Sequence, residues 1–90
     1  MAEPRRYAVK LSRQAGKMLE RLPRGLAQQV TKALRGLEKN PRPHGAKKLT
    51  GYDLYRVRVC DWRIVYQVRD AQLLVLVLKL ASRGDVYSEL

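Results

Sequence analysis

The pattern of apolar and polar positions divides the chain into a short strand, two helices and three longer strands. Residues 7–11 alternate weakly and end at Ser12, a residue type that often caps the start of a helix. Apolar residues then recur at helical spacing in two stretches, which residues 23–25 join and Asn40-Pro41 ends. Both apolar stripes are interpreted as core-packing surfaces that face one sheet.

Three apolar runs in the C-terminal half predict an antiparallel meander. The runs are residues 54–59, 62–69 and 73–81. The turns between them, Cys60-Asp61 and residues 70–72, are short enough to close hairpins. The sequence therefore predicts an α+β fold with the order β-α-α-β-β-β, in which residues 1–90 form one domain.

Charge changes the picture more than hydrophobicity does. The chain has 19 Lys and Arg residues against 8 Asp and Glu, a net charge of +11. Such a basic domain repels itself unless a polyanion or an acidic protein shares its surface, so a nucleic acid or an acidic partner is expected. Cys60 is the single cysteine, which favours a reducing, cytoplasmic location. No apolar run approaches the roughly 20 residues of a membrane span, so no membrane partner is expected.

Alternation along residues 54–59 places apolar and basic side chains on opposite faces of the sheet, with Arg56 and Arg58 on the basic face. If the turn at Cys60-Asp61 is symmetrical, Arg58 lies opposite Arg63 and three guanidiniums gather in one patch. Like charges across a strand pair destabilise a sheet, so this arrangement favours a bound phosphate. A solvated sheet face, with arginine stems covering apolar surface, remains the alternative.

Residues outside this strand pair add further candidates. Lys47 and Lys48 lie in residues 41–51, which contain two prolines and two glycines and are expected to form a basic loop. Arg83 and Tyr87 follow the last strand, where the tyrosine ring has either a packing or a functional role. No Cys/His set or carboxylate cluster has metal-ligand spacing, so neither a metal nor another cofactor is expected.

Four segments, taken together and in this order, resemble the RelE/ParE toxin superfamily over almost the whole chain. They are Leu49-Thr50-Gly51, residues 54–59, residues 61–66 and residues 83–87. RelE-type members are similar in being toxins of type II toxin-antitoxin systems that cut messenger RNA in the ribosomal A site without a metal. The resemblance implies attack by a ribose 2′-hydroxyl on the adjacent phosphate, which leaves a cyclic phosphate and a free 5′-hydroxyl.

The resemblance also implies roles for individual catalytic residues. Arg56 and Arg58 match paired basic positions, and Arg63 matches a phosphate-gripping arginine. Arg83 matches the basic residue after the last strand, and Tyr87 is the implied proton-transfer or base-stacking residue. The best-known RelE pattern has lysines at the paired positions; arginine stays protonated, so only electrostatic stabilisation remains for these two. Together with the two loop lysines, the four arginines form the expected RNA-binding surface.

The resemblance further implies the partners. An acidic, RelB-like antitoxin is expected to cover the arginine face, the ribosome and messenger RNA are the targets, and operator DNA is bound only through the antitoxin complex. Two alternatives remain open. One is a ParE-like gyrase inhibitor, which shares the fold but does not need the basic face. The other is a non-catalytic module whose arginines only hold RNA or the antitoxin.

Overall fold

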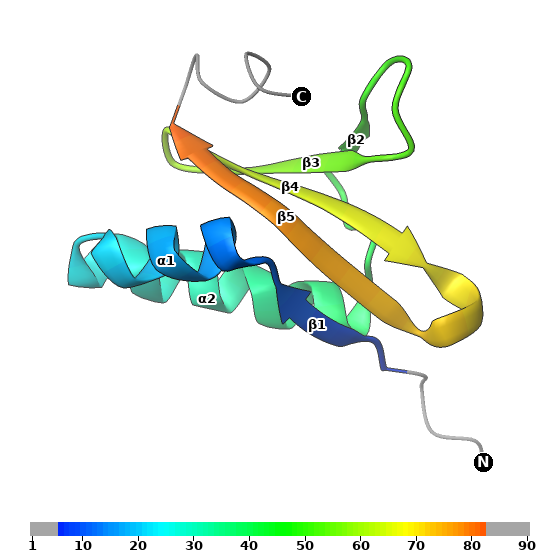
Figure 1. The fold of residues 1–90 in the computed structure, drawn as a ribbon, viewed down its shortest axis with the longest axis horizontal. Coiled ribbons are helices and arrows are strands. Elements are labelled where there is room, and N and C mark those ends of the chain that lie inside the picture. The colour runs from blue at the N-terminus through cyan, green and yellow to red at the C-terminus, as the bar shows by residue number, and fades with distance from the viewer. Residues whose placement is uncertain (1–5, 83–90) are drawn as a thin grey trace.

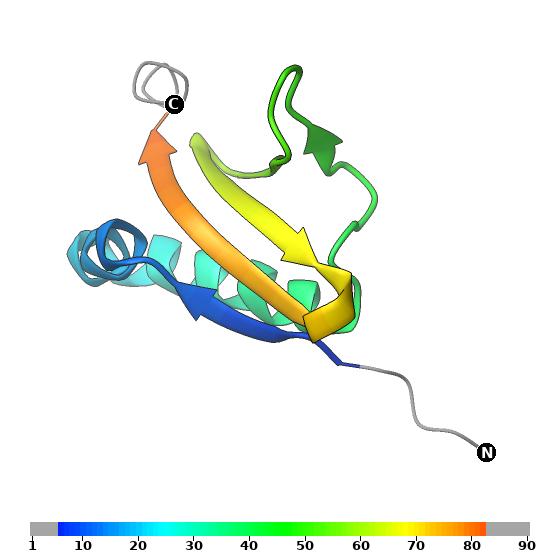
Figure 2. The same ribbon diagram turned by 45° about the vertical axis from the view of Figure 1, so that its right-hand side comes forward.

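The computed structural model describes residues 6–82, which form a five-stranded sheet with two helices on one face (Figure 1). The elements in chain order are β1 (Ala8–Leu11), α1 (Arg13–Arg21), α2 (Arg24–Lys39), β2 (Lys47–Lys48), β3 (Tyr55–Val59), β4 (Trp62–Arg69), the 3-10 turn η1 (Asp70–Gln72) and β5 (Leu74–Ser82). The strand order is β1-β5-β4-β3-β2, with β1 parallel to β5 and the other neighbours antiparallel. Turned by 45°, the twisted sheet shows β1 and β2 at opposite edges (Figure 2). The predicted α+β class is confirmed.

Both helices begin and end close to where the local chemistry predicts. Ser12 Oγ accepts a hydrogen bond from the backbone N–H of Ala15 at 3.1 Å, which confirms the predicted cap of α1. The helix junction is shorter than the expected residues 23–25, because α2 begins directly after Pro23, whose restricted φ suits entry into a helix. In the described part of the chain, neither helix is long and apolar enough to cross a membrane.

Residues 41–51 contain a strand that the sequence pattern did not reveal. They were expected to form a loop throughout, but Lys47 and Lys48 make the edge strand β2, paired with Arg56 and Tyr55 of β3. This expectation was wrong because a strand of two residues is too short to show any periodicity. Its backbone pairing depends on β3, and β2 adds two cations to the edge of the sheet.

The core lies between the helices and one face of the sheet, as the two apolar stripes predicted. Its fully buried side chains include Val30 and Leu37 from α2, Ile64 and Tyr66 from β4, and Val75, Val77 and Leu80 from β5. The Tyr66 hydroxyl donates a hydrogen bond to the Pro41 carbonyl at 2.8 Å, which satisfies a polar group inside the core. Burial raises the pKa of Tyr66 to about 12. The helices leave the opposite face of the sheet uncovered.

A β-bulge in β5 decides which side chains reach that opposite face. Val65 pairs with Lys79 and Tyr66 pairs with Val77, so Leu78 is an extra residue in β5. One inserted residue reverses the alternation of side chains along a strand. Lys79 therefore shares the face of Val65, away from the helices.

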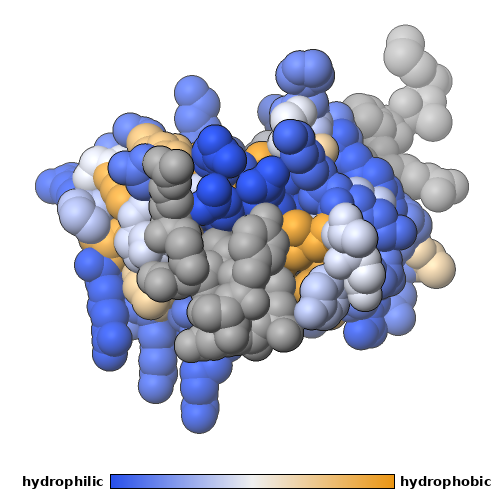
Figure 3. All heavy atoms as spheres, turned by 90° about the horizontal axis from the view of Figure 1, so that it is seen from above, coloured by the Kyte–Doolittle hydropathy of each residue, from blue (hydrophilic) through white to orange (hydrophobic). Residues whose placement is uncertain are grey.

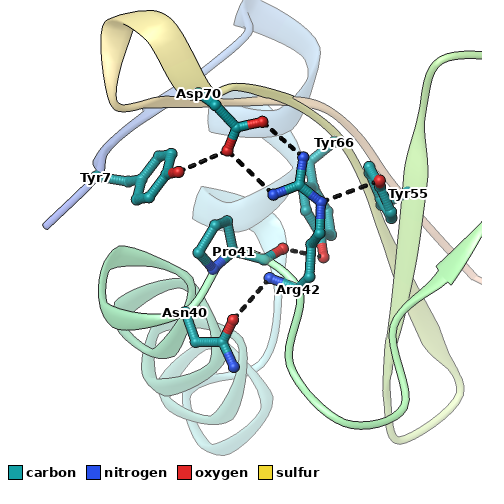
Figure 4. A network of polar contacts seen from close by, with 7 residues as sticks. All are labelled: Tyr7, Asn40, Pro41, Arg42, Tyr55, Tyr66 and Asp70. Atoms are coloured by element: carbon teal, nitrogen blue, oxygen red, sulfur yellow. Dashed lines mark hydrogen bonds and ion pairs between the residues drawn. The ribbon is translucent and has the colours of Figure 1, made fainter. Parts of the chain in front are cut away.

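A polar network holds η1 against the loop after α2 (Figure 4). The Arg42 guanidinium forms an ion pair with Asp70 at 2.8 Å and donates from Nε to the Tyr55 hydroxyl at 3.0 Å. The Tyr7 hydroxyl donates to the other Asp70 oxygen at 2.6 Å. These hydrogen bonds, first that from Arg42, lower the pKa of Asp70 to about 2. Asp70 thus joins three separate parts of the chain.

Candidate nucleic-acid interface

The predicted arginine register is present on the sheet face opposite the helices. Val59 pairs with Trp62 and Arg58 lies directly opposite Arg63, as a symmetrical two-residue turn requires. Cys60 takes a positive φ of 54° in this turn, and its thiol donates to Gln29 Oε1 of α2 at 2.8 Å. This hydrogen bond joins the hairpin end to the helix layer close to both arginines.

Two rows of ladder partners organise this face, which is here named the basic face. The first row is Lys47, Arg56, Val65 and Lys79, and the second is Arg58, Arg63 and Ala81. A small apolar cluster of Leu49, Leu54, Val65 and Ala81 lies on the same face. Figure 3, seen from this side, shows hydrophilic side chains gathered around a small apolar patch. The strands provide a rigid base for closely spaced cations.

Lys79, which interrupts the apolar run of residues 73–81, also belongs to the basic face. It lies in β5, pairs with Val65 of the neighbouring strand β4, and is only 9% exposed, so its side chain is almost covered. Without the bulge at Leu78 it would be assigned to the core side of the sheet. No local sequence signal marks that bulge, which is why this cation was missed.

A hollow of about 150 Å³ opens at the end of the β3–β4 hairpin. It is lined by Arg58, Cys60, Asp61 and Arg63. The Nε atom of Arg63 is buried and has no hydrogen-bond partner among residues 6–82. A buried donor without an acceptor is unfavourable for the fold. Two guanidiniums against one carboxylate suit the hollow to a phosphate group.

The remaining predicted residues fall into two groups. Lys47 and Lys48 are both exposed on β2. Lys47 pairs with Arg56 and lies at the edge of the basic face, whereas Lys48 pairs with Tyr55 and lies on the opposite face of the sheet. Arg83 and Tyr87 lie outside the described residues, so their roles stay predictions. Within residues 6–82, no group of three or more His, Cys, Asp or Glu side chains is placed to hold a metal ion.

Comparison with known proteins places this fold in a family. Residues 9–87 match the family model described as the ParE toxin of the type II toxin-antitoxin system, parDE. A putative RelE-like toxin protein from Escherichia coli is 36% identical over 87 residues, which cover 92% of each chain. The sequence similarity therefore extends over both helices and the whole sheet.

Solved structures agree. The archaeal RelE-RelB complex from Pyrococcus horikoshii OT3 contains a chain that is 32% identical, with a TM-score of 0.75, over 89% of this chain and 98% of that one. The isolated E. coli RelE toxin is 31% identical, with a TM-score of 0.75, over 92% of this chain and 93% of that one. The fold is that of a small α+β toxin domain with a cationic sheet face. The chain belongs to the RelE/ParE toxin family of type II toxin-antitoxin systems.

Proposed function

We propose that this toxin is a ribosome-dependent endoribonuclease that cuts messenger RNA in the ribosomal A site. The observation that carries the proposal is the pairing of Arg58 with Arg63 beside a hollow of about 150 Å³, with Arg56 on the same face. Cross-strand repulsion makes this arrangement unfavourable for the fold alone, and a phosphate group would relieve it. The cytoplasm is the compartment in which such a toxin meets translating ribosomes.

The proposed reaction needs charge stabilisation more than covalent participation by the protein. The ribose 2′-oxygen attacks the adjacent phosphorus and loses its proton to a base, while the bond to the 5′-oxygen breaks and that oxygen gains a proton. The products are a 2′,3′-cyclic phosphate and a 5′-hydroxyl. Negative charge grows on the phosphate oxygens during the attack, and guanidiniums held on strands would oppose it without rearrangement.

Separate roles for the arginines follow from their positions and chemistry. Arg63, which lines the hollow, is proposed to grip a phosphate oxygen, while Arg56 and Arg58 balance the surrounding charge. None of the three would accept a proton, because a guanidinium stays protonated at any working pH. Proton transfer is assigned to Tyr87, and Arg83 is proposed as a further cation that stabilises charge on the phosphate.

The same surface charge supports an acidic antitoxin as the partner of the free toxin. We infer that a RelB-like chain covers the basic face, since the P. horikoshii relative is described in complex with RelB. Covering the cations would relieve their mutual repulsion and would block RNA from the same surface. Operator DNA would then be contacted through the complex and not by the toxin alone.

A gyrase inhibitor is the second candidate, because the matching family model is described as a ParE toxin. A toxin that acts on a DNA topoisomerase does not need three arginines gathered on one sheet face. A non-catalytic module that only holds RNA or the antitoxin is the third. Both alternatives predict that messenger RNA remains intact in a translating extract.

The test is to add purified toxin to a translating extract and map the 5′ ends of a reporter message by primer extension. Cuts inside codons are expected with wild-type protein and ribosomes, and not with ribosome-free RNA. Arg63→Ala should abolish them, whereas Lys10→Ala, which removes an exposed cation from the other edge of the sheet, should not. Intact message would contradict the nuclease, and a gyrase supercoiling assay would then separate the two remaining candidates.

A further inference from the structure

The loop of residues 49–54 forms a raised border beside the basic face. It connects β2 to β3 and rises on the side opposite the helices (Figure 1). Its ends are joined, because the Leu49 N–H donates to the Leu54 carbonyl at 2.9 Å and both leucines are buried in the apolar cluster. Gly51 adopts a φ of 81°, which glycine tolerates, and allows a tight bend. The loop is therefore anchored at its base.

Tyr52 lies at the bend of this anchored loop. It is 47% exposed, whereas Tyr66 in the core is fully buried. A single exposed aromatic side chain needs no functional explanation by itself. The surroundings of Tyr52 provide the argument, because cations from two strands approach the same loop.

A hollow of about 400 Å³ lies between Tyr52 and those cations, within the size range of small-ligand sites. It is lined by Lys47, Lys48, Leu49, Thr50, Tyr52 and Arg56. Lys47 pairs directly with Arg56, and Arg56 is also a member of the arginine patch. The hollow is thus continuous with the basic face and combines an aromatic ring with the two cations of that face, Lys47 and Arg56.

We propose that this hollow binds one single-stranded RNA nucleotide next to the cleaved step, with its base stacked on Tyr52 and its phosphate held by Lys47 and Arg56. This inference rests on the proposed function, since it extends the same RNA path beyond Arg56. An aromatic ring beside a cationic groove is the usual platform for single-stranded nucleic acid, and it tolerates any base because every base has a stacking face.

The charges around Tyr52 also indicate on which side of the loop the RNA phosphates lie. A second hollow, of about 550 Å³, is lined by Tyr52 together with Asp53 and Lys48. Lys48 lines both hollows, so the two differ in their other charges: the Asp53 carboxylate disfavours phosphate in the second, whereas Lys47 and Arg56 attract it in the first. The phosphates therefore run along the Lys47 side of the loop.

The test measures whether the tyrosine ring and the RNA bases act on each other. Binding of a short fluorescein-labelled single-stranded RNA is followed by fluorescence anisotropy, in parallel with a ribose-phosphate oligonucleotide that lacks the bases. Tyr52→Ala should weaken binding of the normal RNA about tenfold and leave the abasic one unchanged. Tyr52→Phe should bind both as wild type does. Leu11→Ala, which shortens another exposed apolar residue at the opposite sheet edge, is the matched control.

The outcomes separate this site from the nuclease. A loss of affinity at Tyr52→Ala that is equal for normal and abasic RNA would contradict base stacking, and so would no loss at all. The binding assay contains no ribosomes and no cleavage step. A base-dependent loss together with uncut message would support the nucleotide site and contradict the nuclease. If Tyr52→Ala leaves RNA affinity unchanged while the message is cut normally, the nucleotide site is contradicted and the nuclease is not.

Discussion

The two faces of the β3–β4 hairpin carry side-chain pairs with opposite effects on stability, although both depend on the same backbone pairing. Val57 lies opposite Ile64 and both pack against the helix layer. One residue further along each strand, Arg58 lies opposite Arg63 on the basic face. Burial of apolar surface stabilises the first pair, whereas like charge destabilises the second. Substitutions of Val57 or Ile64 should therefore change the stability of the fold, whereas substitutions of Arg58 or Arg63 should change activity.

The largest expected difference is between Arg63→Ala and Ile64→Ala. Arg63→Ala should lower the cleavage rate about 100-fold or more, because it removes charge stabilisation of the reacting phosphate, and it should not lower the urea midpoint. Ile64→Ala should cost about 2–5 kcal/mol in the free energy of unfolding, since Ile64 is fully buried. Urea denaturation and primer extension measure the two effects. If Ile64→Ala unfolds the protein, Ile64→Val should cost about 1 kcal/mol and retain cleavage.

A smaller loss of stability is expected when the buried hydroxyl of the core is removed. Tyr66→Phe leaves the Pro41 carbonyl without its donor and should cost about 1–2 kcal/mol in the free energy of unfolding. Urea denaturation measures the change. Tyr52→Phe removes a hydroxyl from an exposed ring and should leave stability unchanged. Equal effects at the two sites would show that the Pro41 hydrogen bond contributes nothing.

A gain of stability is expected on the basic face. Arg58→Thr removes one member of the cross-strand pair and should raise the free energy of unfolding by roughly 0.5 kcal/mol. It should also reduce the slope of log affinity for single-stranded RNA against log salt by about 0.7. Lys10→Thr, opposite the uncharged Leu76, should bring no such gain. A destabilised Arg58→Thr would mean that the arginine stems contribute more by packing than their charges cost.

The smallest effect is expected at Asp70, and only in acid. The pKa of Asp70 is lowered from 3.8 to about 2 by its hydrogen bonds to Arg42 and Tyr7. A lowered pKa means that the folded state holds the carboxylate, so this contribution is present above about pH 4 and is lost between about pH 4 and 2. The melting temperature of Asp70→Asn should lie slightly below that of wild type at pH 6. The difference should disappear near pH 2.

The sequence alone determined those features that depend on neighbouring residues. Ser12 and Asn40-Pro41 bound the helical region because capping and proline act within a few residues. The register of Arg58 with Arg63 was predictable because a two-residue turn leaves one symmetrical pairing. The positions of the paired arginines on one sheet face could therefore be predicted from the sequence, but their chemical role could not.

Tertiary structure decided what depends on partners distant in the chain. The parallel pairing of β1 with β5 and the short strand β2 have no local period to reveal them. The bulge that brings Lys79 to the basic face arises only in the pairing of β5 with β4. The hollow beside Tyr52 likewise requires β2, β3 and their loop to meet. Alternation within a strand tells which side chains share a face, but only packed neighbours determine which strands and loops bring those faces together.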